Sequence, residues 1–207
     1  GRLCCDRDYT RHYAQPVMTP ASVLPAKLEV RPQATASLPL QNRAAALGLG
    51  YRWITPEDHA FLAALYRSTR EAELNRTPWD EAEKQAFIAM QFEAQHVHYQ
   101  AHYPLALWLV ILHGDEPVGR LYLERWEREH RIIDIALLPK ARGQGLGCAI
   151  ILDLQEEAAA LQKSVSIHVE KANPALTLYL RLGFTTQEDK GVYDLMRWDL
   201  PADQVKT

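Results

Sequence analysis

Six residues near the middle of the chain have the types and spacing that suit anion binding. They follow the apolar run 132–138, precede a second apolar run that begins at Cys148, and read Arg142-Gly143-Gln144-Gly145-Leu146-Gly147. A strand, a glycine-rich turn and a helix start leave the first amides of the helix without partners, and glycine lets the backbone approach a ligand closely. The sequence therefore predicts a phosphate or pyrophosphate site at this turn.

Two common phosphate-binding patterns do not fit this turn. A P-loop would need Gly-Lys-Ser/Thr at the helix start, and the turn has none. A dinucleotide-binding Gly-x-Gly-x-x-Gly turn would need a glycine at the position of Cys148. The pattern that remains is Arg-x-x-Gly-x-Gly.

This pattern resembles the acetyl-CoA pyrophosphate loop of the GNAT superfamily of N-acetyltransferases, which reads Gln/Arg-x-x-Gly-x-Gly/Ala. A second block, about thirty residues downstream, supports the resemblance. It is similar to the family segment "Asn … Leu-Tyr-x-x-x-Gly-Phe" and consists of Asn173-Pro174-Ala175 and Leu178-Tyr179-Leu180-Arg181-Leu182-Gly183-Phe184. The resemblance covers roughly residues 50–198.

The resemblance implies that acetyl-CoA lies in a gap between two splayed strands, one ending at Leu138 and the other spanning residues 165–170. Backbone groups of Leu137 and Leu138 would bond the pantetheine arm as a further strand would. Arg142 would either add charge at the pyrophosphate or remain a solvated surface residue. The amides expected to bind the pyrophosphate are those of Arg142, Gly143, Gln144, Gly145, Leu146 and Gly147.

The implied reaction is direct attack by an amine on the thioester in a ternary complex, without a metal ion. A backbone N–H near Leu137 would stabilise the oxyanion. Tyr179 occupies the tyrosine position of the family motif and is the expected acid for the leaving thiolate. A half-buried aromatic residue that packs a helix on the sheet is the alternative reading of Tyr179.

The sequence does not identify the general base. Several family members place a glutamate on the strand before the asparagine, and His168 occupies the corresponding position; neutral histidine can act as a base near pH 7. Glu124, Glu170 and Asp134 are further candidates, and each could instead be an ordinary ion-paired residue. A water relay is also compatible with the sequence. Asn173 would bond the pantetheine arm, cap the following helix, or do both.

A helical segment at residues 87–103 is rich in polar and aromatic side chains, and in the family this region overhangs the acceptor site. His98 and His102 have a spacing that could bind metal, but no third ligand is evident, so no metal is expected. The acceptor is expected to be a small-molecule or peptide amine, and the sequence does not select one. A non-catalytic module that binds and senses CoA is the alternative function, and a nucleotide-binding protein of another fold is a third.

Composition sets wider limits. The chain has 207 residues, 47% hydrophobic and 24% charged, with a net charge of −3, which is typical of a soluble globular protein and does not suggest a nucleic-acid partner. Its apolar runs are too short to span a membrane, and three cysteines give no disulfide framework, so a reducing cytoplasm is the expected location. Many family members pair through late strands, which allows a homodimer.

The periodicity predicts an α/β domain with a central mixed, mostly antiparallel sheet flanked by helices. An irregular or partly disordered lead-in is expected at residues 1–48, with a short helix conceivable around 40–47. The acetyltransferase-like domain is expected at 49–200 and a tail at 201–207. Strands are expected at 51–54, 105–112, 117–126, 131–138, 165–170, 184–187 and 192–198, and helices from 55, from 80 or 81 to 99, from 147 to 161, and at 174–182.

Overall fold

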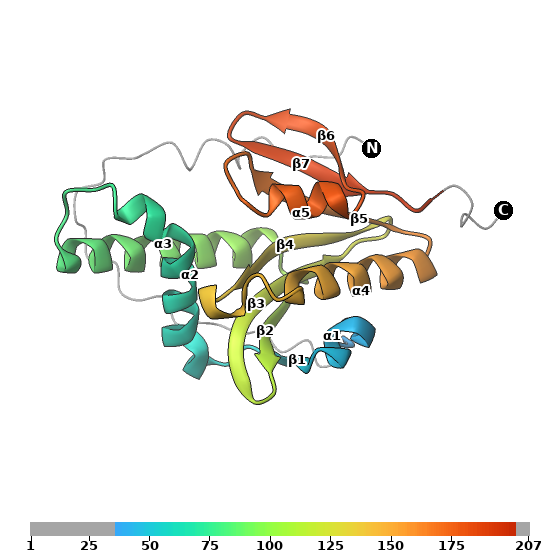
Figure 1. Ribbon diagram of the computed structural model, residues 1–207, viewed down its shortest axis with the longest axis horizontal. Coiled ribbons are helices and arrows are strands. Elements are labelled where there is room, and N and C mark those ends of the chain that lie inside the picture. The colour runs from blue at the N-terminus through green and yellow to red at the C-terminus, as the bar shows by residue number, and fades with distance from the viewer. Residues whose placement is uncertain (1–35, 202–207) are drawn as a thin grey trace.

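The computed structural model describes residues 36–201, and its centre is one sheet of seven strands (Figure 1). The strands lie in the order β1-β2-β3-β4-β5-β7-β6, and only β4 and β5 pair in parallel. This confirms the predicted mixed, mostly antiparallel sheet. The strands are β1 Leu49–Trp53, β2 Leu107–His113, β3 Glu116–Arg125, β4 Glu129–Leu137, β5 Ser164–Glu170, β6 Thr185–Lys190 and β7 Tyr193–Trp198.

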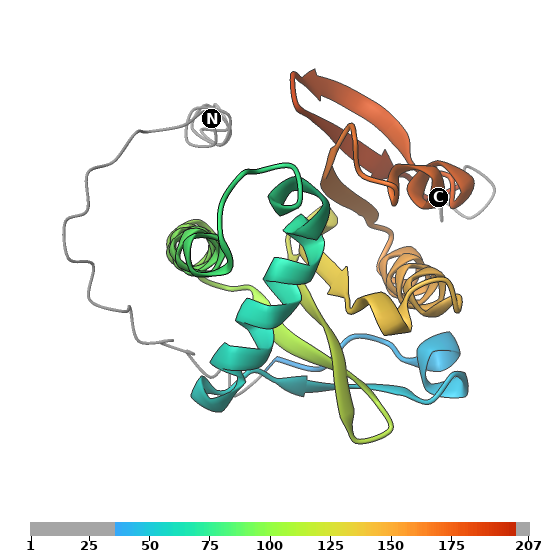
Figure 2. The ribbon, with the colours of Figure 1, turned by 60° about the vertical axis from the view of Figure 1, so that its left-hand side comes forward.

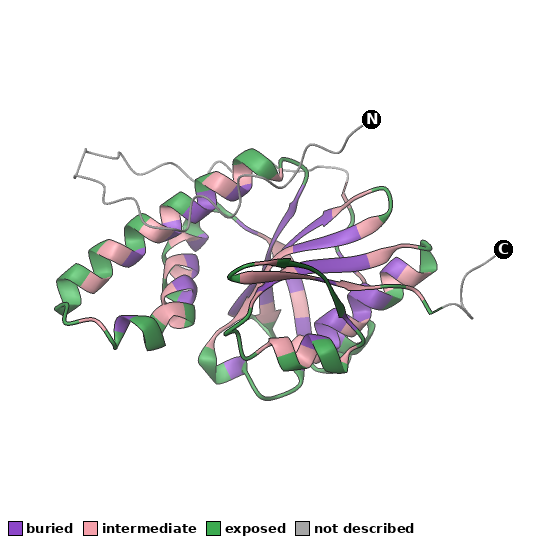
Figure 3. Ribbon diagram, turned by 90° about the horizontal axis from the view of Figure 1, so that it is seen from above, coloured by how far each residue is buried: buried purple, intermediate pink, exposed green. Residues whose placement is uncertain are grey.

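Helices cover both faces of this sheet, α2 and α3 on one side and α4 on the other (Figure 2). Side chains such as Leu62 and Phe92 join α2 and α3 to their face, and Ile150 and Ala158 of α4 lie in the core of the opposite face. Most residues of β2, β3 and β5 are accordingly buried, whereas β6 is largely exposed and α3 has an exposed outer side (Figure 3). The helices are α1 Asn42–Ala46, α2 His59–Leu74, α3 Glu81–His102, α4 Leu146–Ala160 and α5 Leu176–Arg181, with short 3-10 turns η1 Pro56–Asp58 and η2 Pro139–Ala141.

Helix α1 lies in the segment that the sequence assigns to an irregular lead-in, and it confirms the short helix expected around residues 40–47. Its first turn is held by Asp153, a fully buried carboxylate on α4 that accepts hydrogen bonds from the amides of Arg43 and Ala44, both at 2.9 Å. Ala44 is itself fully buried. The packed part of the chain therefore includes α1, while residues 1–35 and 202–207 lie outside the described residues.

The parallel strands β4 and β5 separate halfway along their length. Their pairing runs only from Glu129↔Ser164 to Ile132↔Ile167. Immediately after Ile132, the register of β4 against β3 skips Ile133, which forms a bulge. A bulge bends its strand, so beyond Ile133 strand β4 stays with β3, while β5 stays with β7. The predicted splayed strand pair is present, and the bulge marks where it opens.

Candidate active site

The predicted anion loop connects the end of β4, through η2, to the start of α4. Gly143 and Gly145 have φ angles of +72° and +79°, which favour glycine, and a Cβ at either would meet no atom within 4 Å. A Cβ at Gly147 would make only ordinary contacts. The first bond of α4 runs from Ala149 N to Gly145 O at 3.0 Å, so the amides of residues 143–148 have no helical partner, whereas Arg142 N already donates to Pro139 O at 3.2 Å. The loop therefore presents open backbone amides, as an anion site requires.

The polar side chains of this loop mainly hold its shape. Arg142 is exposed; its Nε donates to Leu137 O at 2.8 Å, and its Nη2 reaches Ser68 Oγ on α2 at 3.4 Å. Gln144 Nε2 donates to Lys140 O at 2.7 Å. Arg142 thus connects the loop to β4 and α2 from a position where its charge also lies beside the open amides.

The two β4 residues expected to bond pantetheine differ in their availability. Leu138 N donates to Val118 O at 2.8 Å, and Leu138 O accepts from Ala141 N at 2.9 Å, so the fold itself uses both groups. Because successive backbone groups of a strand point to opposite edges, the N–H of Leu137 faces away from β3, toward the gap beside β5. Leu137 is therefore the better placed of the two to bond a ligand.

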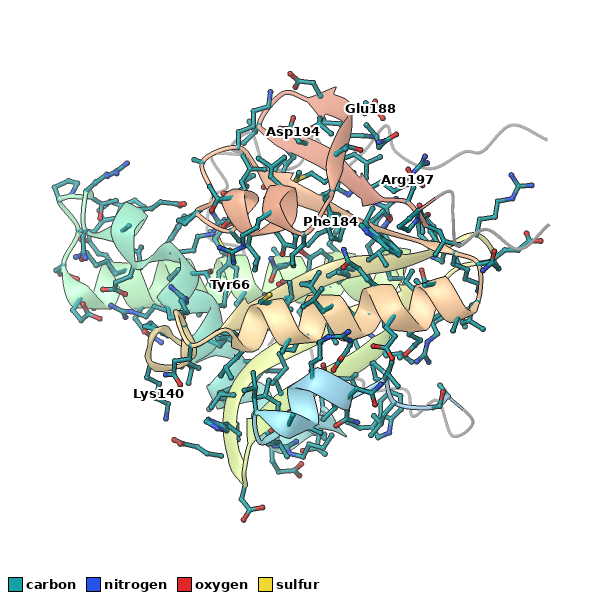
Figure 4. The ribbon with its side chains drawn as sticks, turned by 45° about the vertical axis from the view of Figure 1, so that its right-hand side comes forward. Tyr66, Lys140, Phe184, Glu188, Asp194 and Arg197 are labelled. Atoms are coloured by element: carbon teal, nitrogen blue, oxygen red, sulfur yellow. The ribbon has the colours of Figure 1, made fainter. Side chains whose placement is uncertain are left out.

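A cavity of about 170 Å³ lies between the separated halves of β4 and β5. Residues 133–136 of β4 and 167–170 of β5 form two of its sides, α2 and α3 form a third, and α5 and β7 contribute one tyrosine each. Tyr66, on the α2 side, is labelled in Figure 4. A concave site with convergent polar groups beside an anion loop is a suitable place for a reaction.

Tyr179 lines this cavity from α5. Its side chain is almost completely buried, and its ring packs edge-on against Phe184 with centroids 5.5 Å apart. Burial, and next the nearby Asp134 carboxylate, raises the pKa of Tyr179 above its ordinary value. The phenol is therefore protonated at neutral pH and can donate a hydrogen bond into the cavity. The predicted packing contact is present, and the role of Tyr179 as the acid for the leaving thiolate stays a prediction.

The two leading candidates for the base lie in different places. His168 lines the cavity, but its Nδ1 lies 3.2 Å from Arg131 Nη1. Because arginine only donates, Nδ1 accepts, and the proton of the neutral ring resides on Nε2. Glu124 does not line this cavity; its carboxylate accepts from Leu105 N at 3.0 Å and from Trp126 Nε1 at 2.5 Å. Glu124 thus holds local hydrogen bonds away from the cavity. The Nδ1 lone pair of His168 is already used by Arg131, so it is not available to take a proton from an acceptor.

Asp134 and Glu170 bring carboxylates to opposite sides of the cavity. Glu170 accepts from Tyr193 Oη at 3.0 Å and from Arg70 Nη2 at 3.3 Å. Asp134 pairs with the buried Arg120 at 2.5 Å. Neither Arg70 nor Arg120 was predicted to lie in the site; the available signal was that Arg120 is a charged residue between the uncharged segments 117–119 and 121–123.

The asparagine of the second motif forms a turn just before α5, but it does not cap the helix, whose N-cap residue is Ala175 and has no side-chain cap. Asn173 Oδ1 accepts from Ala175 N at 2.9 Å, and the residue also lines the cavity. From α3, Gln95 and Tyr99 reach the cavity, whereas His98 and His102 stack on each other with centroids 4.0 Å apart.

Over residues 36–201, no cluster of three or more His, Cys, Asp or Glu side chains could hold a metal ion. Within the same range no helix is long and apolar enough to cross a membrane.

Comparison with known proteins gives the family. The model of the acetyltransferase (GNAT) family matches residues 60–184, which is more than half of the chain. The chain therefore belongs to the GNAT family of acetyltransferases. Among curated protein sequences, none matches this chain significantly.

Solved structures agree on the fold. The PaiA N-acetyltransferase of Thermoplasma acidophilum, in complex with coenzyme A, aligns with a TM-score of 0.54 and 16% identity over 73% of this chain and 98% of its own. An acetyltransferase of Thermus thermophilus aligns with a TM-score of 0.53 and 20% identity over 74% of this chain and 98% of its own. At these identities the comparison establishes a shared fold.

Proposed function

We propose that this protein is an N-acetyltransferase that moves the acetyl group of acetyl-CoA to a primary amine by direct attack in a ternary complex. The observation that carries the proposal is the loop at the start of α4. Its open amides lie at the end of the strand that borders the cavity, so one extended ligand could reach both. The PaiA enzyme with the same fold was crystallised with coenzyme A, which supports this cofactor.

In this proposal the cofactor's pyrophosphate lies on the amides of residues 143–147, and its pantetheine arm enters the gap between β4 and β5. The Leu137 N–H bonds the thioester oxygen and stabilises the tetrahedral oxyanion. Asn173, which begins the turn into α5, contacts the arm from the opposite side of the gap. These contacts direct the acyl carbon toward the cavity.

The acceptor enters the cavity as an ammonium ion and must lose two protons in total. One leaves before attack, through water, to Glu170, the more exposed of the two cavity carboxylates. The amine nitrogen then bonds the acyl carbon, the carbon–sulfur bond breaks, and Tyr179 donates a hydrogen bond to the departing thiolate. The second proton of the amine passes to the thiolate, so CoA leaves as the thiol.

Gly145→Ala tests the cofactor site. A side chain at this positive φ costs about 1–2 kcal/mol and restricts the approach of a phosphate to the amides. By isothermal titration calorimetry, we expect CoA to bind the wild-type protein and to bind the variant at least about 10-fold more weakly. Thiol release with an amine panel then measures turnover.

Gly191→Ala is the matched control, because Gly191 in the β6–β7 hairpin has φ +81° and equally open surroundings. It carries the same conformational cost and should bind CoA like the wild-type protein. Equal CoA affinity in all three proteins, or no CoA binding by the folded wild-type protein, would refute the proposal. Binding without turnover on any amine would favour a CoA sensor.

A further inference from the structure

The most buried charged side chain that lines the cavity belongs to an ion pair whose hydrogen-bonding groups are only partly occupied. Arg120 is 2% exposed and Asp134 is 15% exposed, and they lie on the adjacent strands β3 and β4. Arg120 donates through Nη2 to Gln95 Oε1 at 2.8 Å and to Asp134 Oδ2 at 2.5 Å, and its guanidinium lies 5.1 Å from the centre of the Tyr122 ring. Its Nε is buried with no hydrogen-bond partner among the described residues. A guanidinium has five N–H donors, so most of its capacity remains unused.

Only one carboxylate oxygen of Asp134 accepts a hydrogen bond from the described residues. Its Oδ2 accepts from Arg120, and among the described residues no donor bonds its Oδ1. Both residues line the cavity, as Tyr179 does, and the Asp134 carboxylate lies near enough to Tyr179 to raise the pKa of its hydroxyl. The end of the cavity that holds the proposed acid therefore presents unsatisfied donors and an unsatisfied carboxylate oxygen side by side.

Charge balance restricts what such a pair can accept. Arg120 and Asp134 together are neutral and lie in a poorly solvated place, where an added net charge is costly. A plain ammonium ion would satisfy Asp134 but leave the Arg120 donors without an acceptor and add one positive charge. A ligand that carries an ammonium and a carboxylate close together satisfies both residues and adds no net charge.

We propose, on the basis of the proposed acetyltransferase function, that the acceptor is a free α-amino acid whose ammonium binds Asp134 and whose carboxylate binds Arg120. This orientation places the α-nitrogen beside Tyr179 and the acyl carbon. The outer ion pair between Arg70 and Glu170 then faces the amino acid side chain.

The reaction itself favours release of the product from such a site. The α-ammonium gives one proton through water to Glu170, its nitrogen bonds the acyl carbon as the carbon–sulfur bond breaks, and its second proton passes to the thiolate, so CoA leaves as the thiol. The resulting N-acetyl amino acid keeps its carboxylate but has lost its positive charge. Asp134 then faces a neutral amide in a site with an excess negative charge, which weakens binding after transfer.

The first test uses the wild-type protein and matched acceptors. Alanine, methionine, phenylalanine and glutamate are each compared with the amine that lacks the α-carboxylate, and with the α-amide. Loss of charge-assisted hydrogen bonds to a guanidinium predicts that kcat/KM for the best amino acid exceeds that of its amine by about 10- to 100-fold. Amines or amides that react as well as the amino acids would overturn the inference, as would an amino acid panel without turnover on a protein that binds acetyl-CoA.

The second test uses Arg120→Gln and measures the ratio of the two kcat/KM values. We expect the preference for the amino acid to fall about 10-fold or more, with Arg120→Lys between the two proteins. Arg125→Gln is the matched control, because Arg125 lies on the same strand, is ion-paired to Glu157 at 2.7 Å, and does not line the cavity. An unchanged ratio in a folded Arg120→Gln protein would overturn the assignment of Arg120. Failure of CoA to bind would instead refute the proposed function.

Discussion

At the scale of single residues, Tyr179 gives the most direct test of the chemistry. Its raised pKa, caused first by burial, keeps the phenol protonated at neutral pH. Tyr179→Phe removes this donor and preserves the ring that packs on Phe184. We expect turnover at pH 7 to fall by roughly 10²-fold or more, with acetyl-CoA affinity little changed. Steady-state kinetics and calorimetry measure the two quantities separately.

Tyr51→Phe provides the control for this substitution. Tyr51 is also buried, but it lies outside the cavity, and its hydroxyl has no hydrogen-bond partner within the described residues. Removing that hydroxyl should leave turnover unchanged. A Tyr179→Phe enzyme with undiminished turnover would remove Tyr179 from the mechanism.

Site residues could be predicted from the sequence where their role depends on residues that are adjacent in the chain. The loop from Arg142 to Gly147 takes its geometry from adjacent glycines and the following helix, so its motif was informative. Arg120 was not assigned to the site, because its partners Gln95 and Asp134 lie 25 and 14 positions away and meet it only in the folded chain. Glu124 was proposed as a base, but its neighbours Leu105 and Trp126 occupy both of its oxygens.

At the scale of elements, the contact between β3 and β4 holds the bordering strand of the cavity in place. Gly119 permits this contact, since a Cβ there would lie 2.4 Å from Ala136 O and 2.7 Å from Leu137 Cδ2. The carbonyl oxygen is part of the β4 backbone and cannot rotate away. Any side chain at Gly119 must therefore push β4 toward the gap that would receive the pantetheine arm.

Gly119→Ala should therefore affect both stability and cofactor binding. We expect a loss of about 1–3 kcal/mol in the free energy of unfolding, as for overpacked cores, and weaker acetyl-CoA binding. Urea denaturation and calorimetry measure these effects. Gly50→Ala on β1 is the control, because a Cβ there meets no atom within 4 Å, and its effect should stay within about 0.5 kcal/mol. Similar losses in the two variants would contradict this account.

The order and type of the elements followed from periodicity, but their ends depend on local contacts. The connection between the strands expected at 184–187 and 192–198 is shorter than predicted, since Lys190 still pairs with Tyr193 and only Gly191 and Val192 connect the strands. Gly191 has a positive φ, as a two-residue hairpin loop requires. No glycine or proline marks the bulge at Ile133, which lies between Ile132 and Asp134, and only the pairing of β4 with β3 reveals it.

At the scale of the whole molecule, Glu157 on α4 connects three separate parts of the chain. Its Oε1 accepts from Arg125 Nε on β3 at 2.7 Å and lies 3.0 Å from His130 Nε2 on β4, and its Oε2 accepts from the amide of Leu40, before α1, at 2.8 Å. Burial alone would raise the pKa of Glu157, but these hydrogen bonds outweigh burial and lower it from 4.5 to about 2. The ionised carboxylate therefore contributes to stability.

The lowered pKa determines the direction of a pH effect. A carboxyl group that is more acidic in the folded than in the unfolded protein stabilises the fold fully above the unfolded value of 4.5, and this contribution is lost as pH falls toward about 2. We expect Glu157→Gln to lower the free energy of unfolding at pH 7 by about 1–3 kcal/mol and to flatten its fall between pH 4.5 and 2. Urea denaturation across this range measures both.

The neighbouring Glu156→Gln separates this effect from a general loss of negative charge on α4. Glu156 is 44% exposed and pairs with Arg43, whereas Glu157 is only 15% exposed. An exposed ion pair contributes at most about 1 kcal/mol, so Glu156→Gln should retain nearly the wild-type pH dependence. If both variants showed the same slope below pH 4.5, another carboxylate would connect acid unfolding to the packing of α1, α4 and the sheet.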